Sequence, residues 1–241
     1  MAKATSSPLH QLARLVKNLI ALLLIPIFLG LVQGLRQEMD AHLVGGRSMY
    51  DWVMAGVVGY MIIHLFLYRP TAVFQFHHRV LSVLSKWLFG GQVSTAESMD
   101  DKPSGKRKGK PRAPSEAPQE STLLVLSPYL VPFYTVMLCA FSWMVSRWIA
   151  GSTLGGVVGA LIGASLSMHW IMTAADLQEH REQVPFDAYL MALVIIGLFS
   201  LLIVMVCMPM AVPDVSLPSM LSDAIERTRA IYSAIIQTLF F

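Results

Sequence analysis

The stretch Gly151–Trp170, which reads GSTLGGVVGALIGASLSMHW, decides the fold of this chain. It carries no acidic residue, lysine or arginine, and its length matches the about 20 residues that a helix needs to cross a bilayer. Ser167 continues a row of glycines that are spaced four residues apart, Gly151, Gly155, Gly159 and Gly163. Residues four apart share one face of a helix, so this face is bare backbone.

A face of small residues allows another helix to approach closely, and this contact drives helix association in lipid. The sequence leaves two partners open for the glycine row. One is another helix of the same chain, and the other is a second copy of the chain, which would make a homo-oligomer. Membrane lipid and other transmembrane proteins are the partners that we expect on the remaining surface.

The composition of the whole chain is that of an integral membrane protein. Of its 241 residues 55% are hydrophobic and 14% are charged, against about 25% charged in soluble domains. Mean hydropathy is +0.58. The net charge of +3 is too small to indicate a nucleic-acid partner.

Further apolar segments lie on both sides of the glycine row. The predicted membrane spans are Leu19–Leu35, Trp52–Tyr68, Leu126–Ile149, Thr153–Ala175 and Asp187–Met210. Ala72–Phe89 is also long enough, but it is polar and would need neighbouring helices around it at membrane depth. The predicted fold class is all-α, a polytopic membrane bundle of five or six embedded helices with a C-terminal amphipathic helix.

Composition divides the chain into four parts. Residues 1–93 hold the first helices and the polar one, 94–121 form a basic linker expected to be disordered, 122–211 hold the later spans, and 212–241 form the tail helix. In the tail, a predicted apolar stripe contains Leu221, Ile225, Thr228, Tyr232, Ile235, Ile236 and Leu239. We expect this helix to lie on the membrane surface or against a partner.

The basic linker sets the predicted orientation. By the positive-inside rule it is cytoplasmic, so the last three spans run outward, inward and outward. The N-terminus is outside if Ala72–Phe89 crosses the bilayer and inside if that segment is re-entrant. The sequence leaves both possibilities open.

Two polar motifs carry a resemblance to a known family. Phe74–Val93 reads FQFHHRVLSVLSKWLFGGQV, and Leu126–Thr135 reads LSPYLVPFYT before the glycine-rich helix that ends near His169. This order resembles a bacterial branch of the site-2 protease family, the intramembrane zinc metalloproteases. In that family a helix with His-Glu-x-x-His precedes a Gly-Gly turn, and two histidines one turn apart bind zinc beside a glutamate base.

The resemblance implies that the catalytic motif has been lost. In the register of the Gly-Gly turn, His78 matches the first ligand, Arg79 stands at the glutamate position and Ser82 at the second histidine. Asp187 would match the acidic third ligand. His77, His78, Arg79, His169 and Asp187 are therefore expected to form a ligand site or a polar network, without catalytic residues or a metal.

The predicted function is that of a non-catalytic pseudoprotease, a subunit or helix-binding partner in a membrane complex. Localisation in the bacterial inner membrane goes with the resemblance. Two alternatives stay open. An atypical zinc metalloprotease would hold zinc through His77 or His78 with His169 and Asp187. A small proton or ion transporter subunit would use the histidines and Arg79 as its path.

Overall fold

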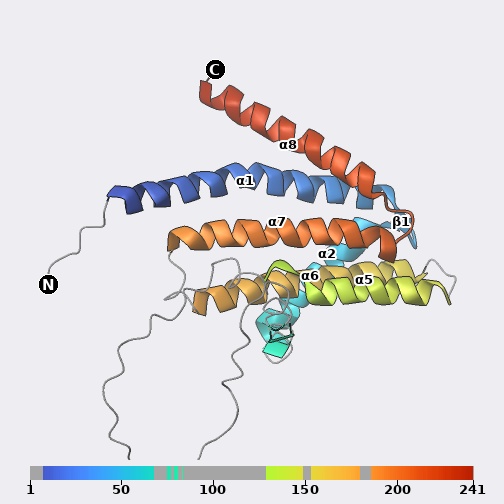
Figure 1. Ribbon diagram of the computed structural model, residues 1–241. Helices are drawn as coiled ribbons and strands as arrows, with labels where there is room; N and C mark the ends of the chain where they lie inside the picture. The colour runs from blue at the N-terminus through green and yellow to red at the C-terminus, as the bar shows by residue number, and fades with distance from the viewer. Residues whose placement is uncertain are drawn as a thin grey trace, which may run out of the picture.

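The computed structural model describes residues 8–67, 129–148, 153–179 and 186–240, together with positions 75, 76, 79, 80 and 83. Most of the described chain is helical (Figure 1). The helices of five residues or more in this part of the chain are α1 Pro8–Ala41, α2 Met49–Ile62, the π-helical η1 Ile63–Leu67, α5 Phe133–Ser146, α6 Thr153–Glu179, α7 Phe186–Ala211 and α8 Leu217–Phe240. The one sheet described is the short hairpin of β1 Leu43–Val44 and β2 Arg47–Ser48.

The fold is an all-α helical bundle of membrane type, as the sequence predicted. Four stretches of the described helices are long and apolar enough to cross a bilayer: Leu15–Ala41, Met49–Phe66, Gly155–Gln178 and Tyr189–Ala211. Many large apolar side chains on these helices are exposed at the surface of the bundle. A soluble protein rarely exposes so much apolar surface, whereas hydrocarbon is a suitable solvent for it.

The helices stack in layers around α1 and α7. In Figure 1 α1 lies between α8 and α7, and α7 lies between α1 and the pair α5 and α6. Helix α2 packs along α6. The larger buried cluster joins all of these layers and is centred on Met49, Ile162, Met205, Met208 and Met220.

The directions of the helices define two ends of the bundle. The start of α5 contacts the last turns of α6 through Tyr129, and Ser142 near the end of α5 contacts Ala211 at the end of α7. The first residues of α1, α5 and α7 therefore share one end with the last residues of α6. The hairpin, the start of α6 and the start of α8 lie at the other end (Figure 1).

The glycine row on α6 packs against α2 of the same chain. A Cβ on Gly163 would lie 2.0 Å from the carbonyl oxygen of Val53, and one on Gly159 would lie 2.8 Å from Met49. The contact is reciprocal, because a Cβ on Gly56 of α2 would lie 1.8 Å from the carbonyl oxygen of Ala160. A side chain at Gly56 or Gly163 would meet backbone and force the two helices apart, whereas one at Gly159 would displace the end of the Met49 side chain.

The hairpin between α1 and α2 was not predicted. Gly45 and Gly46 both have positive φ, 60° and 79°, which is the conformation that a two-residue turn of this kind requires. Ser48 then caps α2 by accepting a hydrogen bond from the Asp51 amide at 3.1 Å. The indole of Trp52 donates to the carbonyl of Val44 at 3.0 Å and holds the hairpin on α2.

Two predicted spans differ from the observed helices. The predicted span Leu126–Ile149 is wrong in length, because α5 has only 14 residues and begins after Pro132, whose ring stands at the N-cap. The first span is longer than predicted, since α1 continues from Pro8 to Ala41 through Pro26.

The tail helix α8 packs along α1, and only part of the predicted stripe forms the contact: Thr228 and Tyr232 belong to the stripe, whereas Met220 and Ala224 do not. Ile225, which belongs to that stripe, is exposed, and the packed residues are Met220, Ala224 and Thr228. They lie on Gly30 and Gly34 of α1; a Cβ on Gly34 would lie 2.6 Å from the backbone of α8. Small residues on both helices allow this close approach, and hydrophobicity alone did not identify them.

Some predictions fall outside the described residues. These are the 94–121 linker, most of the polar segment Ala72–Phe89, and the boundary at residue 93.

Candidate functional site

Buried polar side chains gather on one face of α6. They recur at helical spacing: Ser165, His169 and Thr173 are buried, and Asp176, on the same face, is partly buried. The face turns toward Tyr129–Pro132 and the first turn of α5. Polar side chains within a membrane helix are costly unless they have partners, so each of these groups needs an explanation.

His169 holds the backbone ahead of α5. The side chain is 3% exposed, and its Nε2 donates to the carbonyl oxygen of Tyr129 at 3.0 Å. This carbonyl belongs to the helical residues 129–130 just before α5, and the Phe133 amide donates to Val131 instead of to it. The imidazole therefore satisfies a carbonyl that lacks a donor from the start of α5, where Pro132 has no N–H to offer.

Asp176 holds the same residue by its side chain. The hydroxyl of Tyr129 donates to Asp176 Oδ2, two turns of α6 beyond His169. Tyr129 is buried in a small apolar cluster that includes Met172 and Leu177 of α6 and Ile196 of α7. Two polar side chains of α6 thus fix one tyrosine through its backbone and its ring.

The same strip continues into α5 and α7. The hydroxyls of Thr135 and Ser165 lie 2.9 Å apart in a buried hydrogen bond between α5 and α6. Ser142 donates to the carbonyl oxygen of Ala211 at 3.3 Å. These bonds connect a helix that is too short to span a membrane to two helices that are long enough.

The described residues do not form a zinc centre like that of the site-2 proteases. Among them no group of three or more histidine, cysteine, aspartate or glutamate side chains lies close enough to hold a metal ion. His169 uses Nε2 on a carbonyl oxygen, and Asp176 accepts from a tyrosine. The donors on α6 therefore do not fit a three-ligand zinc site among these residues.

The candidate residues from the sequence are described to different extents. His77, His78 and Gly151 lie outside the described residues, and Asp187 is described only as a backbone position in the first turn of α7. Arg79 is an exposed helical residue. Within the proposed network, His169 forms a hydrogen bond with the backbone carbonyl of Tyr129.

Sequence reasoning missed the importance of Tyr129 and Thr173. Tyr129 belongs to the motif LSPYLVPFYT, but the sequence analysis assigned it no function. A buried tyrosine usually has a hydrogen-bond partner for its hydroxyl, and this requirement could have pointed to Tyr129. Thr173 has a signal in its spacing, because it lies four residues after His169 on the same helix face.

Comparisons of the chain with protein-family models, with curated proteins and with solved structures found no match.

Proposed function

We propose that this chain is a non-catalytic integral membrane protein, a pseudoprotease of site-2 protease type that serves as a subunit of a membrane complex by binding a partner's transmembrane helix. A bacterial inner membrane is the proposed location. The observation that carries the non-catalytic part is the use of His169 and Asp176, which both hold Tyr129. Side chains that hold Tyr129 by hydrogen bonds are not positioned to bind a metal ion or to activate a water nucleophile.

Support for the helix-binding part comes from the way α1 and α8 separate. At one end they are joined by Gly30 and Gly34, and the hydroxyl of Tyr232 donates to the carbonyl of Leu23. Beyond Tyr232 α8 diverges from α1 (Figure 1), and all its described residues from 233 onward are exposed. We call the two diverging arms, residues 15–23 of α1 and 230–240 of α8, the α1–α8 fork.

The arms of the fork suit an apolar occupant. Lys17 is their one charged residue, and Leu239 and Phe240 at the tip of α8 are 71% and 75% exposed. The charged residues of α8 lie instead near the joined end, where Arg227 donates to Gln37 at 2.9 Å and Arg36 pairs with Asp40. This division supports an apolar partner for the last part of α8, because the polar half of α8 lies beside the polar end of α1.

The experiment is site-specific photo-crosslinking of the full chain in its native membrane. A benzophenone amino acid replaces Leu19 or Ile236 on the two arms. Val157 and Phe66, which are exposed apolar residues elsewhere, are the matched controls. We expect Leu19 and Ile236 to give the same discrete protein adduct, and mass spectrometry to map it to an apolar segment of span length in the partner.

Lipid adducts alone at all four positions would contradict helix binding by the fork. The same protein adduct from Val157 or Phe66 would contradict it as well, because the contact would then have no preference for the fork.

A further inference from the structure

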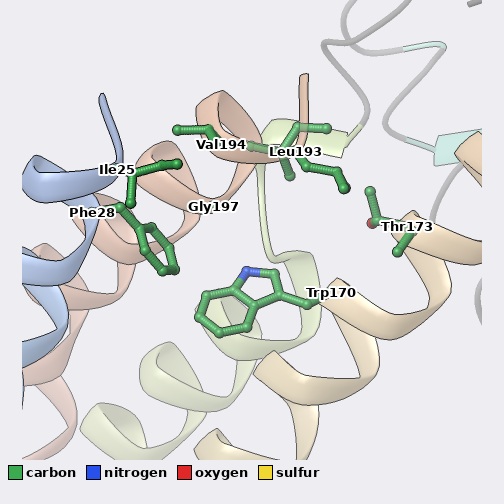
Figure 2. Close-up of a pocket in the computed structure, with 9 residues that line it drawn as sticks. Ile25, Phe28, Trp170, Thr173, Leu193, Val194 and Gly197 are labelled. Carbon is green, nitrogen blue, oxygen red and sulfur yellow. The ribbon is translucent and has the colours of Figure 1, made fainter. Parts of the chain in front are cut away.

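A pocket between α1, α6 and α7 is lined almost wholly by apolar side chains (Figure 2). Its volume is about 290 Å³, at the lower end of the roughly 300–1,000 Å³ typical of small-molecule sites. Phe28 of α1 and Trp170 of α6 face each other across it with ring centroids 6.1 Å apart, and Leu193 and Val194 of α7 form another wall. Gly197 keeps the α7 wall flat, since a Cβ there would lie 2.9 Å from the Phe28 ring.

Two polar atoms belong to this apolar lining. The indole Nε1 of Trp170 and the hydroxyl of Thr173 are both buried, and neither has a hydrogen-bond partner within the described part of the chain. Thr173 is only 1% exposed. Figure 2 draws both residues at the edge of the same space, with the Thr173 oxygen turned inward.

Unpaired polar atoms at this place are costly. Thr173 is five residues before Gln178, the end of the apolar stretch of α6, which is about 8 Å along the helix. At that depth lipid offers no water to pair with the hydroxyl or the indole N–H. A buried donor without an acceptor is rare in folded proteins, so each of these two atoms calls for an explanation.

We infer that this pocket binds an uncharged apolar molecule through a carbonyl oxygen, which accepts hydrogen bonds from Trp170 Nε1 and from the Thr173 hydroxyl. An indole N–H only donates, so the ligand must bring an acceptor. Among the described residues no ionisable side chain lines the pocket, so a carboxylate or phosphate would find no counter-charge from them. The carbonyl has two possible sources, the ester of a membrane lipid or a free apolar carbonyl compound of the quinone type.

The test uses decylubiquinone as the probe and the fluorescence of the full chain in nanodiscs as the readout. One set of nanodiscs contains ester-linked phosphatidylcholine, and the other contains the ether-linked lipid, which has no ester carbonyl. Thr173→Val removes the hydroxyl and keeps the shape, Ala174→Leu fills the pocket, and Ser146→Ala, which removes an exposed hydroxyl on α5, is the matched control. All variants keep Trp170 as the reporter.

We expect saturable quenching in the wild type and in Ser146→Ala, an affinity about fivefold weaker in Thr173→Val, as the loss of one hydrogen bond implies, and no saturable part in Ala174→Leu. Saturation in both kinds of nanodisc assigns the pocket to a free carbonyl compound, and saturation in ether lipid alone assigns it to a lipid ester. No saturable quenching in either lipid would overturn the inference. Equal quenching in all folded variants would overturn it too.

Discussion

Gly56 and Gly59 stand one turn apart on α2, yet their surroundings are opposite. A Cβ on Gly56 would meet the backbone of Ala160 on α6, whereas one on Gly59 would meet no atom within 4 Å. At the residue scale, the contact between α2 and α6 therefore depends on the absence of a side chain at particular glycines, and hydrophobicity does not distinguish these glycines from the others. The glycine row of α6 was visible in the sequence, but its counterpart Gly56 has no repeated spacing that would identify it.

The first prediction compares the same substitution at these two glycines. Gly56→Ala should destabilise the fold by about 1–3 kcal/mol, because overpacking separates α2 from α6. Gly59→Ala should be neutral or slightly stabilising, since alanine favours a helix over glycine by about 1 kcal/mol. Thermal unfolding in detergent measures both, and equal losses in the two variants would contradict the observed α2–α6 contact.

The second prediction concerns Tyr129 and Asp176. Tyr129→Phe and Asp176→Asn each weaken or remove the hydrogen bond between α6 and the start of α5. A double-mutant cycle should give a coupling free energy of about 1–2 kcal/mol. Unfolding free energies of the wild type, both single variants and the double variant provide the cycle. Additive losses would mean that the two side chains do not act together.

At the scale of elements, α8 depends on a carboxylate from another helix. Glu38 of α1 is 8% exposed, and its Oε1 accepts from the Ser216 amide at 2.7 Å, just before α8 begins. His42 contacts the same oxygen at 3.3 Å. An anion at the N-terminus of a helix satisfies a free amide and opposes the positive end of the helix dipole.

The third prediction is that Glu38→Ala loosens α8 from α1. The loss should be about 1–2 kcal/mol, and amide hydrogen exchange should rise in residues 216–224. Asp40→Ala is the control two residues away, because the Arg36–Asp40 pair is exposed and such pairs contribute little. Equal exchange in both variants would show that Glu38 does not hold the start of α8.

Sequence patterns predicted the elements unevenly for physical reasons. Long apolar runs identify helices such as α7 directly, because hydrocarbon imposes their length. Hydropathy could not identify the contact of α8 with α1, which uses small residues, or the shortness of α5, which follows from Pro132. In the same way, His169 could be identified as a polar residue in an apolar run. Its partner is the backbone carbonyl of Tyr129, and the sequence does not show where a backbone carbonyl lies.

At the scale of the whole molecule, the charge pattern of the sequence predicts an orientation for the bundle. The starts of α1 and α5 share one end (Figure 1), and the largest basic cluster of the sequence, Lys102 to Arg112, precedes α5. The positive-inside rule predicts that this cluster is cytoplasmic. On that basis we predict that the start of α5 faces the cytoplasm and that the N-terminus lies inside the cell.

The fourth prediction tests this orientation with single cysteines in a chain whose Cys139 and Cys207 are replaced by alanine. Leu43→Cys in the hairpin and Asp214→Cys before α8 should react with an impermeant maleimide in intact cells. Gln178→Cys, exposed at the opposite end, should react only after the cells are permeabilised. The reverse pattern would contradict the orientation, and labelling of all three in intact cells would contradict the bundle as a membrane-crossing unit.

The account depends most on the claim that the polar side chains of α6 are scaffold and not a metal centre. Elemental mass spectrometry of the purified full chain tests this most directly, with the wild type beside His78→Ala and His169→Ala. We predict no stoichiometric zinc in any of the three and a loss of thermal stability in His169→Ala, because the Tyr129 carbonyl loses its donor. About one zinc ion per wild-type chain, absent from either variant, would contradict the account. It would favour the alternative hypothesis of a zinc metalloprotease.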